Sequence, residues 1–188
     1  MFILSSLIYY GGKMYDKNFL HALNFTLSQE GGYNNDPDDF GKITYKGITQ
    51  KTYDYYVKKY GKKHKNVSQL SNDEIMEFFY HEFWKESGAD KIRNSVKATI
   101  LFDSAVLLGT QTAKSLYNKS NGNMNKFLDY RENYHKKVIQ KYPKQKKYEQ
   151  GWMNRVNDLR DIADKYETLS NALTEEISAK KTQQNVSF

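Results

Sequence analysis

Two carboxylates and a hydroxyl lie close together near the start of this chain of 188 residues, in the segment QEGGYNNDPDDFGKITYKGIT. Glu30 comes first, Asp39 follows nine residues later, and Thr44 follows five residues after that. Two carboxylates that flank a glycosidic bond can hydrolyse it, because one protonates the leaving oxygen while the other activates water or stabilises the transition state. Most of the functional information in the sequence lies in this segment.

A helix must deliver Glu30 to such a site. The apolar residues between Asp16 and Gln29 recur at helical spacing, so the sequence predicts a helix here with Asp16 as its N-cap. Glu30 falls three residues after Leu27, on the apolar face, and Gly31 suits the left-handed turn that often ends a helix. We expect partial desolvation there to favour the protonated carboxyl that a general acid needs. The alternative is a solvated glutamate in a frayed last turn.

The residues after Glu30 predict a small β-hairpin region. Positions 31–39 are rich in the turn formers Gly, Asn, Asp and Pro, and strand formers follow them. Such a hairpin would fold back over the helix end and bring Asp39 and Thr44 towards Glu30. Adjacent Asp38 and Asp39 have a second interpretation, because aspartates in turns usually bond their own backbone.

The remainder of the chain predicts a mainly α fold. Periodicity and capping residues indicate further helices over Thr49–Tyr60, Ser71–Phe83, Val96–Leu108, Thr110–Tyr117, Asn123–Tyr142 and Tyr148–Tyr166. The stretch that contains Asp103 is apolar enough to be a central buried helix. Asp103 must therefore be paired or functional, because an isolated buried charge is costly. Arg131 is a candidate partner for it.

Composition restricts the class of protein. Hydrophobic residues make up 38% of the chain and the mean hydropathy is −0.86, which indicates one soluble domain with a real core. The absence of cysteine excludes a disulfide framework and a thiolate nucleophile. A net charge of +7 favours anionic partners, but no nucleic-acid motif is present. His81-Glu82 does not continue into a HExxH zinc motif, and we expect neither a metal nor another cofactor.

The two ends of the chain differ from its middle. The first ten residues, MFILSSLIYY, are apolar but too few to span a membrane. They lack the basic start and cleavage site of a signal peptide. We expect an upstream start or a disordered extension, with a signal or a membrane anchor as alternatives. From about Thr168 the chain is polar and weakly periodic, which predicts a frayed tail.

The motif residues resemble those of known enzymes. Glu30, Asp39 and Thr44 resemble the Glu-Asp-Thr triad of phage T4-type lysozymes, with one residue fewer before the threonine than those enzymes usually have. The longer pattern resembles glycoside hydrolase family 108, the N-acetylmuramidases of phages and bacteria that are sometimes labelled secretion activators. The resemblance covers roughly Asp16 to Asp158, and its residues are Glu30-Gly31-Gly32-Tyr33, Asn35-Asp36-Pro37, Asp39, Gly41, Thr44-Tyr45, Gly47-Ile48-Thr49, Phe83-Trp84, Phe102-Asp103, Gly109, Arg131, Tyr134, Gly151-Trp152 and Asn154-Arg155-Val156.

One position departs from the family pattern. The family usually has two glycines after the aspartate, and this chain has Gly41-Lys42. The carboxylates and the hydroxyl are retained, so the chemistry is intact, while the turn and the edge of the substrate site are altered.

The resemblance implies a mainly α, lysozyme-like helical domain at residues 14–166, with a small β-hairpin region after the first helix. It divides this domain into a catalytic part at 14–95 and a helical, peptidoglycan-binding-like part at 96–166. An apolar extension at 1–13 and a polar tail at 167–188 would flank the domain.

The activity that the resemblance implies is hydrolysis of the β-1,4 bond between N-acetylmuramic acid and N-acetylglucosamine in peptidoglycan. Glu30 would protonate the leaving oxygen, and Asp39 would activate water or stabilise the oxocarbenium-like transition state. Thr44 would position the water or Asp39, while Tyr33 and Tyr45 would line the sugar groove.

Several alternatives stay open at this stage. Asp38 or Asp103 could be the second carboxylate in place of Asp39. A lytic transglycosylase, which needs a single acid, or a non-catalytic wall-binding or secretion-assembly protein could account for the same family pattern. As an endolysin of phage or prophage origin, the protein would be made in the cytoplasm and act on the glycan strands of the cell wall. We expect it to be a monomer with no stable membrane anchor.

Overall fold

The computed structural model describes the backbone of residues 7–10, 12–29, 44–45 and 47–186, and the side chains of residues 12–29 and 47–178. In chain order the elements are β1 (Leu7–Tyr10), β2 (Lys13–Asp16), α1 (Lys17–Gln29), β3 (Thr44–Tyr45), β4 (Ile48–Thr49), α2 (Gln50–Tyr60), η1 (Val67–Gln69), α3 (Asn72–Phe79), η2 (Tyr80–Lys85), η3 (Ala89–Lys91), α4 (Ser95–Leu108), α5 (Thr110–Lys119), α6 (Met124–Lys141), η4 (Pro143–Tyr148) and α7 (Glu149–Val186).

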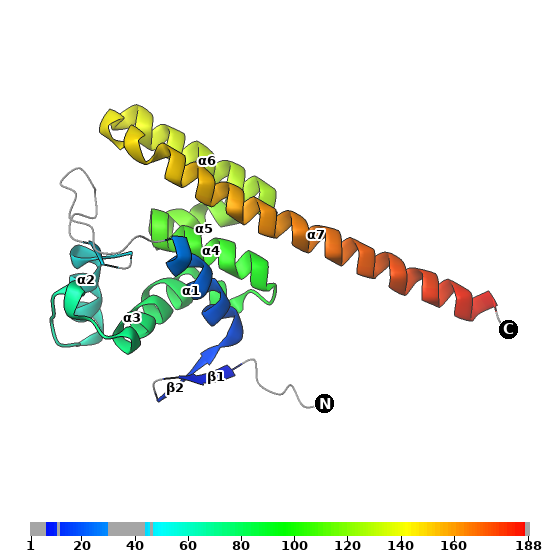
Figure 1. Ribbon diagram of the computed structural model, residues 1–188, viewed down its shortest axis with the longest axis horizontal. Coiled ribbons are helices and arrows are strands. Elements are labelled where there is room, and N and C mark those ends of the chain that lie inside the picture. The colour runs from blue at the N-terminus through cyan, green and yellow to red at the C-terminus, as the bar shows by residue number, and fades with distance from the viewer. Residues whose placement is uncertain (1–6, 11, 30–43, 46, 187–188) are drawn as a thin grey trace.

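Helices pack around α4, which lies at the centre of the molecule (Figure 1). Helix α1 packs along α4, and the long helices α6 and α7 lie side by side next to them. Helices α2 and α3 lie on the other side of α4, near the β3–β4 hairpin (Figure 1). The fold is therefore mainly α with a small hairpin after the first long helix, which confirms the predicted lysozyme-like class.

Local capping explains where the helices begin. Asp16 Oδ1 accepts a hydrogen bond from the backbone of Asn18 at 2.8 Å, and Thr49 Oγ1 accepts one from Thr52 N at 3.1 Å. Ser71 and Glu74 form the predicted capping box at the start of α3. These caps satisfy backbone N–H groups that have no partner within the helix, so short sequence signals were sufficient to locate these helix starts.

The N-terminal segment differs from the sequence prediction. Leu7–Tyr10 form the strand β1, which pairs antiparallel with β2 in the register Leu7↔Asp16 to Tyr10↔Lys13. Gly12, with φ of 79°, adopts the left-handed conformation in the turn between the strands. Tyr15 on β2 is buried and its ring lies 5.5 Å from that of Phe19. The expectation of a disordered extension is therefore wrong for residues 7–10.

The C-terminal segment also differs. Helix α7 continues without a break to Val186, so the prediction of a frayed chain from Thr168 is wrong. The sequence contains no glycine or proline after Gly151, and many of its residues have good helix propensity. A weak apolar period was a poor guide here, because it reports burial rather than backbone conformation.

The hydrophobic core is rich in aromatic rings. Phe19 of α1 is fully buried, with its ring 5.7 Å from Trp84 and 5.9 Å from Phe102. Helix α4 is buried on almost every side from Val96 to Ala105, as the sequence predicted. Side chains from both predicted parts of the domain, residues 14–95 and residues 96–166, belong to this one core.

A buried ionic cluster joins four helices through Asp103, in the middle of α4. Asp103 Oδ2 accepts a hydrogen bond from Arg131 of α6 at 2.7 Å, and Oδ1 accepts one from Arg155 of α7 at 2.7 Å. Thr26 of α1 donates to Oδ1 at 3.1 Å, and Arg131 also donates to Ser104 at 3.0 Å. This confirms the predicted pairing with Arg131 and adds a second arginine.

The charge of Asp103 depends on these two arginines. Burial alone would raise the pKa of the Asp103 carboxyl, but the guanidinium groups of Arg155 and Arg131 outweigh it and lower the pKa to about 2. Both Asp103 and Arg131 are completely buried. The carboxylate therefore compensates positive charge that water cannot reach.

His135 of α6 lies beside this cluster. Its ring stacks on Trp152 of α7, with centroids 4.6 Å apart and planes tilted by 21°. Burial lowers the pKa of His135 to about 3, and the charges of Arg131 and Arg155 act in the same direction. The imidazole is therefore neutral in the folded protein over most of the pH range.

Replacing Asp103 with asparagine should destabilise the fold strongly. Asp103→Asn keeps the shape but removes the buried negative charge that two guanidinium groups bind, and we expect a loss of about 3–5 kcal/mol in the free energy of unfolding. Asp129→Asn is the matched control, because Asp129 binds Arg160 at 2.7 Å but is 58% exposed, and its loss should stay below about 1 kcal/mol. Urea titrations measure both; similar small losses would contradict a central role for Asp103.

His135 should make stability depend on pH. Its pKa is lower in the folded than in the unfolded chain, so the unfolded chain binds the proton first as the pH falls below about 6.5. The stabilisation is complete above that pH and should be lost at roughly 1.4 kcal/mol per pH unit as the pH falls towards 3. His135→Phe preserves the stacking on Trp152, and denaturant titrations from pH 7 to 5 should show a flatter slope for it. Identical slopes would refute the assignment.

Candidate functional site: a cleft beside the hairpin

The structure places only part of the predicted catalytic set. Glu30, Tyr33 and Asp39 lie outside the described residues, and so do the side chains of Thr44 and Tyr45. The backbone of Thr44 and Tyr45 forms β3, which pairs antiparallel with β4. The structure thus confirms a short hairpin at the predicted threonine.

The end of α1 is fixed by contacts to two other helices. In its last turns, Thr26 donates to Asp103 of α4, and Gln29 Nε2 donates to Asp158 of α7 at 3.0 Å. These contacts therefore fix the position of Gln29, the residue that precedes Glu30 in the sequence. Asp103 itself is fully buried and bound by arginines, so it is not available as the second carboxylate of a sugar site.

A cleft of about 790 Å³ lies beside the hairpin. We call it the hairpin cleft. Its wall on the hairpin side includes Gly47 and Thr49, and its far wall consists of residues 106–112 at the junction of α4 and α5. Helix α2 and the turns around η2 complete its lining. A concave site of this size could accommodate sugar units of a chain.

Segment 30–43 ends at the hairpin cleft and follows a helix that packs on one of its walls. At the hairpin end, Thr44 pairs with Thr49, which lines the cleft. At the other end, α1 packs along α4, and the last turn of α4, from Val106 to Leu108, lines the cleft. The segment that contains the predicted carboxylates is therefore bounded by elements that border or support the same cavity.

Glu82 is an acidic residue of this cleft that differs from an ordinary surface glutamate in its backbone conformation and its burial. It lies on η2, a π-helical stretch at Tyr80–Lys85, and such irregular turns occur often at functional sites. Burial raises the pKa of Glu82; the charge of Lys59 opposes this effect and that of Glu86 adds to it. Oε2 lies 3.7 Å from Lys59 Nζ and accepts no hydrogen bond from the described residues. Glu82 is therefore a largely buried carboxyl within the cleft wall, held near the ammonium group of Lys59.

Lys59 and Tyr55 of α2 also line the hairpin cleft. Burial opposes the charge of Lys59, but hydrogen bonds to Glu86 and Tyr60 outweigh it and raise the lysine pKa. The Lys59 ammonium lies 5.9 Å from the centre of the Tyr55 ring. Tyr55 is 60% exposed, although it is a large aromatic residue. An exposed ring beside charged hydrogen-bonding groups can stack on a sugar while its neighbours bind hydroxyl or acyl groups.

Sequence reasoning did not identify these cleft residues. Tyr55 lies on the solvent side of a helix whose apolar face was clear, and Glu82 was considered only as part of a zinc motif. An exposed tyrosine on a polar helix face was the available signal for Tyr55. The signal for Glu82 was absent, because a π-helical turn leaves no distinctive sequence pattern. Among the described residues, no group of three or more His, Asp or Glu side chains could hold a metal ion.

Sequence comparison finds a related family. The model of the glycosyl hydrolase 108 family matches residues 23–109. This part of the chain is therefore similar to glycosyl hydrolase family 108. The matched region contains Glu30, Asp39 and Thr44 and extends to the far wall of the hairpin cleft at Gly109. No curated protein matches the chain in sequence.

A solved structure supports the fold. The structure of SagA from Brucella abortus is similar, with a TM-score of 0.65 and 20% sequence identity, and the similarity covers 78% of this chain and 94% of the SagA chain. At this identity the likeness shows the fold alone.

The family match has a functional consequence. Similarity to glycosyl hydrolase family 108 is similarity to glycoside hydrolases that act on peptidoglycan. Within the described part of the chain, none of the helices combines the length and apolarity that crossing a membrane requires.

Proposed function

We propose that the protein is an N-acetylmuramidase of the endolysin type. It hydrolyses the β-1,4 bond between N-acetylmuramic acid and N-acetylglucosamine in the bacterial cell wall. The observation that carries this proposal is that segment 30–43 ends at the hairpin cleft and follows a helix that packs on α4, whose last turn forms part of the cleft wall. The family match over the same segment supports the assignment of its carboxylates to catalysis.

The proposed roles follow the chemistry of glycoside hydrolysis. Glu30 follows directly on the fixed end of α1 and protonates the leaving oxygen. Asp39 activates water or stabilises the positive charge that develops on the sugar ring. Thr44, in the hairpin strand opposite Thr49, positions the water or Asp39. Tyr33 and Tyr45 line the groove next to these groups.

The hairpin cleft holds the glycan in this proposal. Tyr55 stacks on a sugar ring, and Lys59 binds a carbonyl or carboxylate of the muramic acid side. Glu82 lies behind Lys59 in the cleft wall and holds part of the negative charge that this lysine faces. The last turn of α4 and the first turn of α5 form the opposite wall, which orients the chain relative to segment 30–43.

Removing the acid tests the catalytic assignment. Glu30→Gln keeps the shape but cannot donate the proton, so we expect lysis of purified cell walls to fall roughly 10²–10⁴-fold, the usual contribution of general acid catalysis. Binding to the walls in a co-sedimentation assay should be unchanged. The pair Asp39→Asn and Asp38→Asn separates the second carboxylate from its neighbour, and only the Asp39 variant should lose comparable activity. Activity of Glu30→Gln within a few-fold of the wild type would contradict the proposal.

The products distinguish this reaction from its alternatives. Mass spectrometry of digested walls should show N-acetylmuramic acid at the new reducing ends. Ends in the 1,6-anhydro form would identify a lytic transglycosylase instead. Reducing N-acetylglucosamine would mean that the other glycosidic bond is cleaved.

Tyr55 tests the role of the cleft. Tyr55→Ala removes the exposed ring, so we expect KM for soluble peptidoglycan fragments to rise about 10-fold, equivalent to ~1.4 kcal/mol of binding, with little change in kcat. Tyr142→Ala is the matched control, because Tyr142 is also an exposed tyrosine with a lysine ammonium 5.2 Å from its ring centre. Unchanged KM for Tyr55→Ala would place the glycan outside this cleft.

A further inference from the structure

The second half of α7 extends away from the rest of the protein. The helix continues to Val186, and in Figure 1 its C-terminal part projects beyond every other helix. Every side chain from Asp164 to Ser178 is exposed. From Asp164 to the end of the helix the projection measures about 35 Å, at 1.5 Å per residue. Packing within the domain does not account for this projecting part of the helix.

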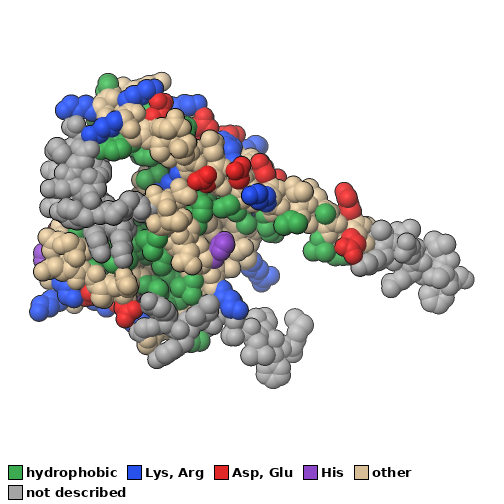
Figure 2. All heavy atoms as spheres, in the orientation of Figure 1, with side chains coloured by type: hydrophobic (Ala, Val, Ile, Leu, Met, Phe, Trp, Pro, Cys, Tyr) green, Lys and Arg blue, Asp and Glu red, His purple; other side chains and the backbone are tan. Residues whose placement is uncertain are grey.

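An apolar stripe follows this projecting helix. Tyr166, Leu169, Leu173 and Ile177 recur at intervals of three or four residues and lie within an arc of roughly 80° around the helix. Leu169 is 71% exposed, Leu173 58% and Ile177 46%. Figure 2 shows hydrophobic side chains that continue along this helix, next to charged ones.

The stripe continues a face that is buried further back on the same helix. Leu159 and Ala163 are fully buried against the domain, and Ile162 packs against the same core. At helical spacing, Leu159 falls on the same side as Tyr166 and Leu173. Beyond Ala163, the face that packs on the domain therefore projects into solvent with its apolar residues still in place.

We expect a helix with these properties to pack against a partner. Helical segments in water derive most of their stability from packing an apolar face rather than from propensity alone. Contiguous exposed apolar surface on a soluble protein usually marks an interaction site. The arrangement of the residues on α7 indicates what that partner is.

We propose that the projecting part of α7 pairs antiparallel with the same segment of a second copy of this chain. If the twofold axis passes between Asn171 and Ala172, Tyr166 of one copy faces Ile177 of the other, and Leu169 lies beside Leu173. All four apolar residues of each helix then meet apolar residues of the second copy. This replaces the monomer expected from the sequence.

Charge at the flank of the stripe favours the antiparallel orientation. Lys165 and Glu176 lie on the same flank, within about 20° of each other around the helix axis. In the antiparallel pair, Lys165 of one copy lies within about 3 Å, measured along the axis, of Glu176 of the other. The symmetry produces this contact twice. A parallel pair in register would instead place this flank of the two copies on opposite sides of the interface, so that Lys165 would not meet Glu176.

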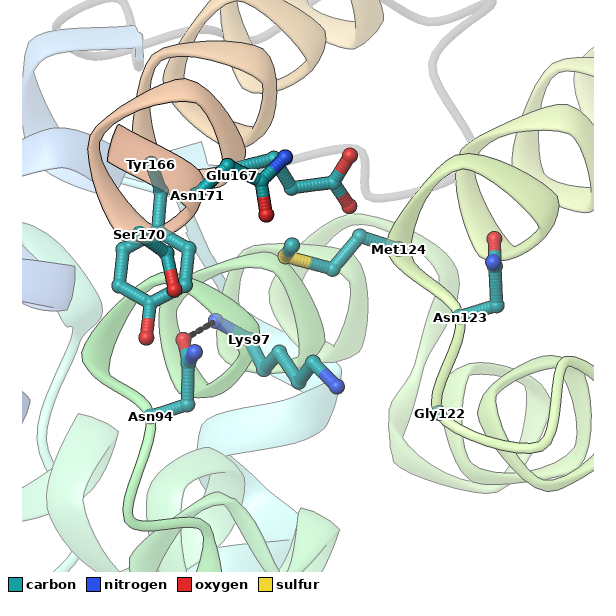
Figure 3. Close-up of a pocket in the computed structure, with 9 residues that line it drawn as sticks. All are labelled: Asn94, Lys97, Gly122, Asn123, Met124, Tyr166, Glu167, Ser170 and Asn171. Atoms are coloured by element: carbon teal, nitrogen blue, oxygen red, sulfur yellow. Dashed lines mark hydrogen bonds between the residues drawn. The ribbon is translucent and has the colours of Figure 1, made fainter. Parts of the chain in front are cut away.

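A cavity lies at the base of the projecting helix. It has a volume of about 220 Å³ and lies between α7 and the starts of α4 and α6. Figure 3 shows Tyr166 and Ser170 of α7 on one side of it, with Asn94 and Lys97 on the other. In the antiparallel pair, Ile177 of the second copy faces Tyr166 and therefore lies at the edge of this cavity.

Oligomeric state is the first test. The wild-type chain should sediment as a dimer in analytical ultracentrifugation at micromolar concentration and dissociate on dilution. Leu173→Glu buries a charge in each half of the interface, so its dimer dissociation constant should rise at least ~100-fold. Thr168→Glu is the matched control, because it places the same charge on the opposite side of the helix, and it should remain a dimer. Circular dichroism checks that each variant is folded.

Charge reversal tests the orientation. Lys165→Glu alone and Glu176→Lys alone should each weaken the dimer several-fold, and the double variant should restore it, because the two charges exchange roles across the twofold axis. Two single variants whose effects simply add in the double variant would overturn the proposed contact.

Cross-linking gives an independent answer, because the chain has no cysteine. Under oxidation, a mixture of Tyr166→Cys and Ile177→Cys chains should form the mixed disulfide, whereas either variant alone should not cross-link. Cross-linking of either variant alone would indicate a parallel pair and overturn the orientation. A wild-type chain that stays monomeric at 100 µM would overturn the dimer. If that monomer co-sedimented with anionic phospholipid vesicles, the stripe would be a membrane-binding face. These outcomes do not depend on hydrolase activity.

Discussion

The position of the candidate active site depends on the buried carboxylate of Asp103. It is the only acidic side chain in the described part of the chain that is completely buried, and its oxygens bind groups from α1, α6 and α7. A charge in this position has to be compensated from fixed directions, because the interior cannot supply water in place of a lost partner. Four helices are therefore held at defined angles around one point, and α1 is fixed against α4, whose last turn lines the cleft.

Local signals in the sequence predicted much of this architecture. The caps at Asp16, Thr49 and Ser71 determine helix starts through contacts within three residues, so they could be read without knowledge of the fold. The need of Asp103 for a partner could also be predicted, because the physical cost of an unpaired buried charge does not depend on topology. The contribution of Arg155 could not, since it lies 52 residues away from Asp103 and only the packing of α7 brings it there.

The features that sequence reasoning missed depend on tertiary context. The strand β1 forms because Tyr15 is anchored in the aromatic core and Gly12 permits a tight turn, and neither fact is visible in an apolar run of ten residues. The hairpin cleft depends on η2, where a π-helical turn places Glu82 beside Lys59 of another helix. The family pattern predicted the candidate catalytic segment. The walls of the cleft form only when α2, η2 and the α4–α5 junction come together in the fold.

The two ends of segment 30–43 are constrained by different kinds of interaction. At the α1 end, hydrogen bonds to Asp103 and Asp158 hold the helix against two others. At the hairpin end, Ile48 is fully buried and Thr49 serves both as a strand residue and as the N-cap of α2. Anchoring both ends of a segment reduces the entropy that must be lost when it adopts a catalytic geometry. Lys42, the one departure from the family pattern, lies between these two anchors in the sequence, so a change of its side chain alters the contacts of neither anchor.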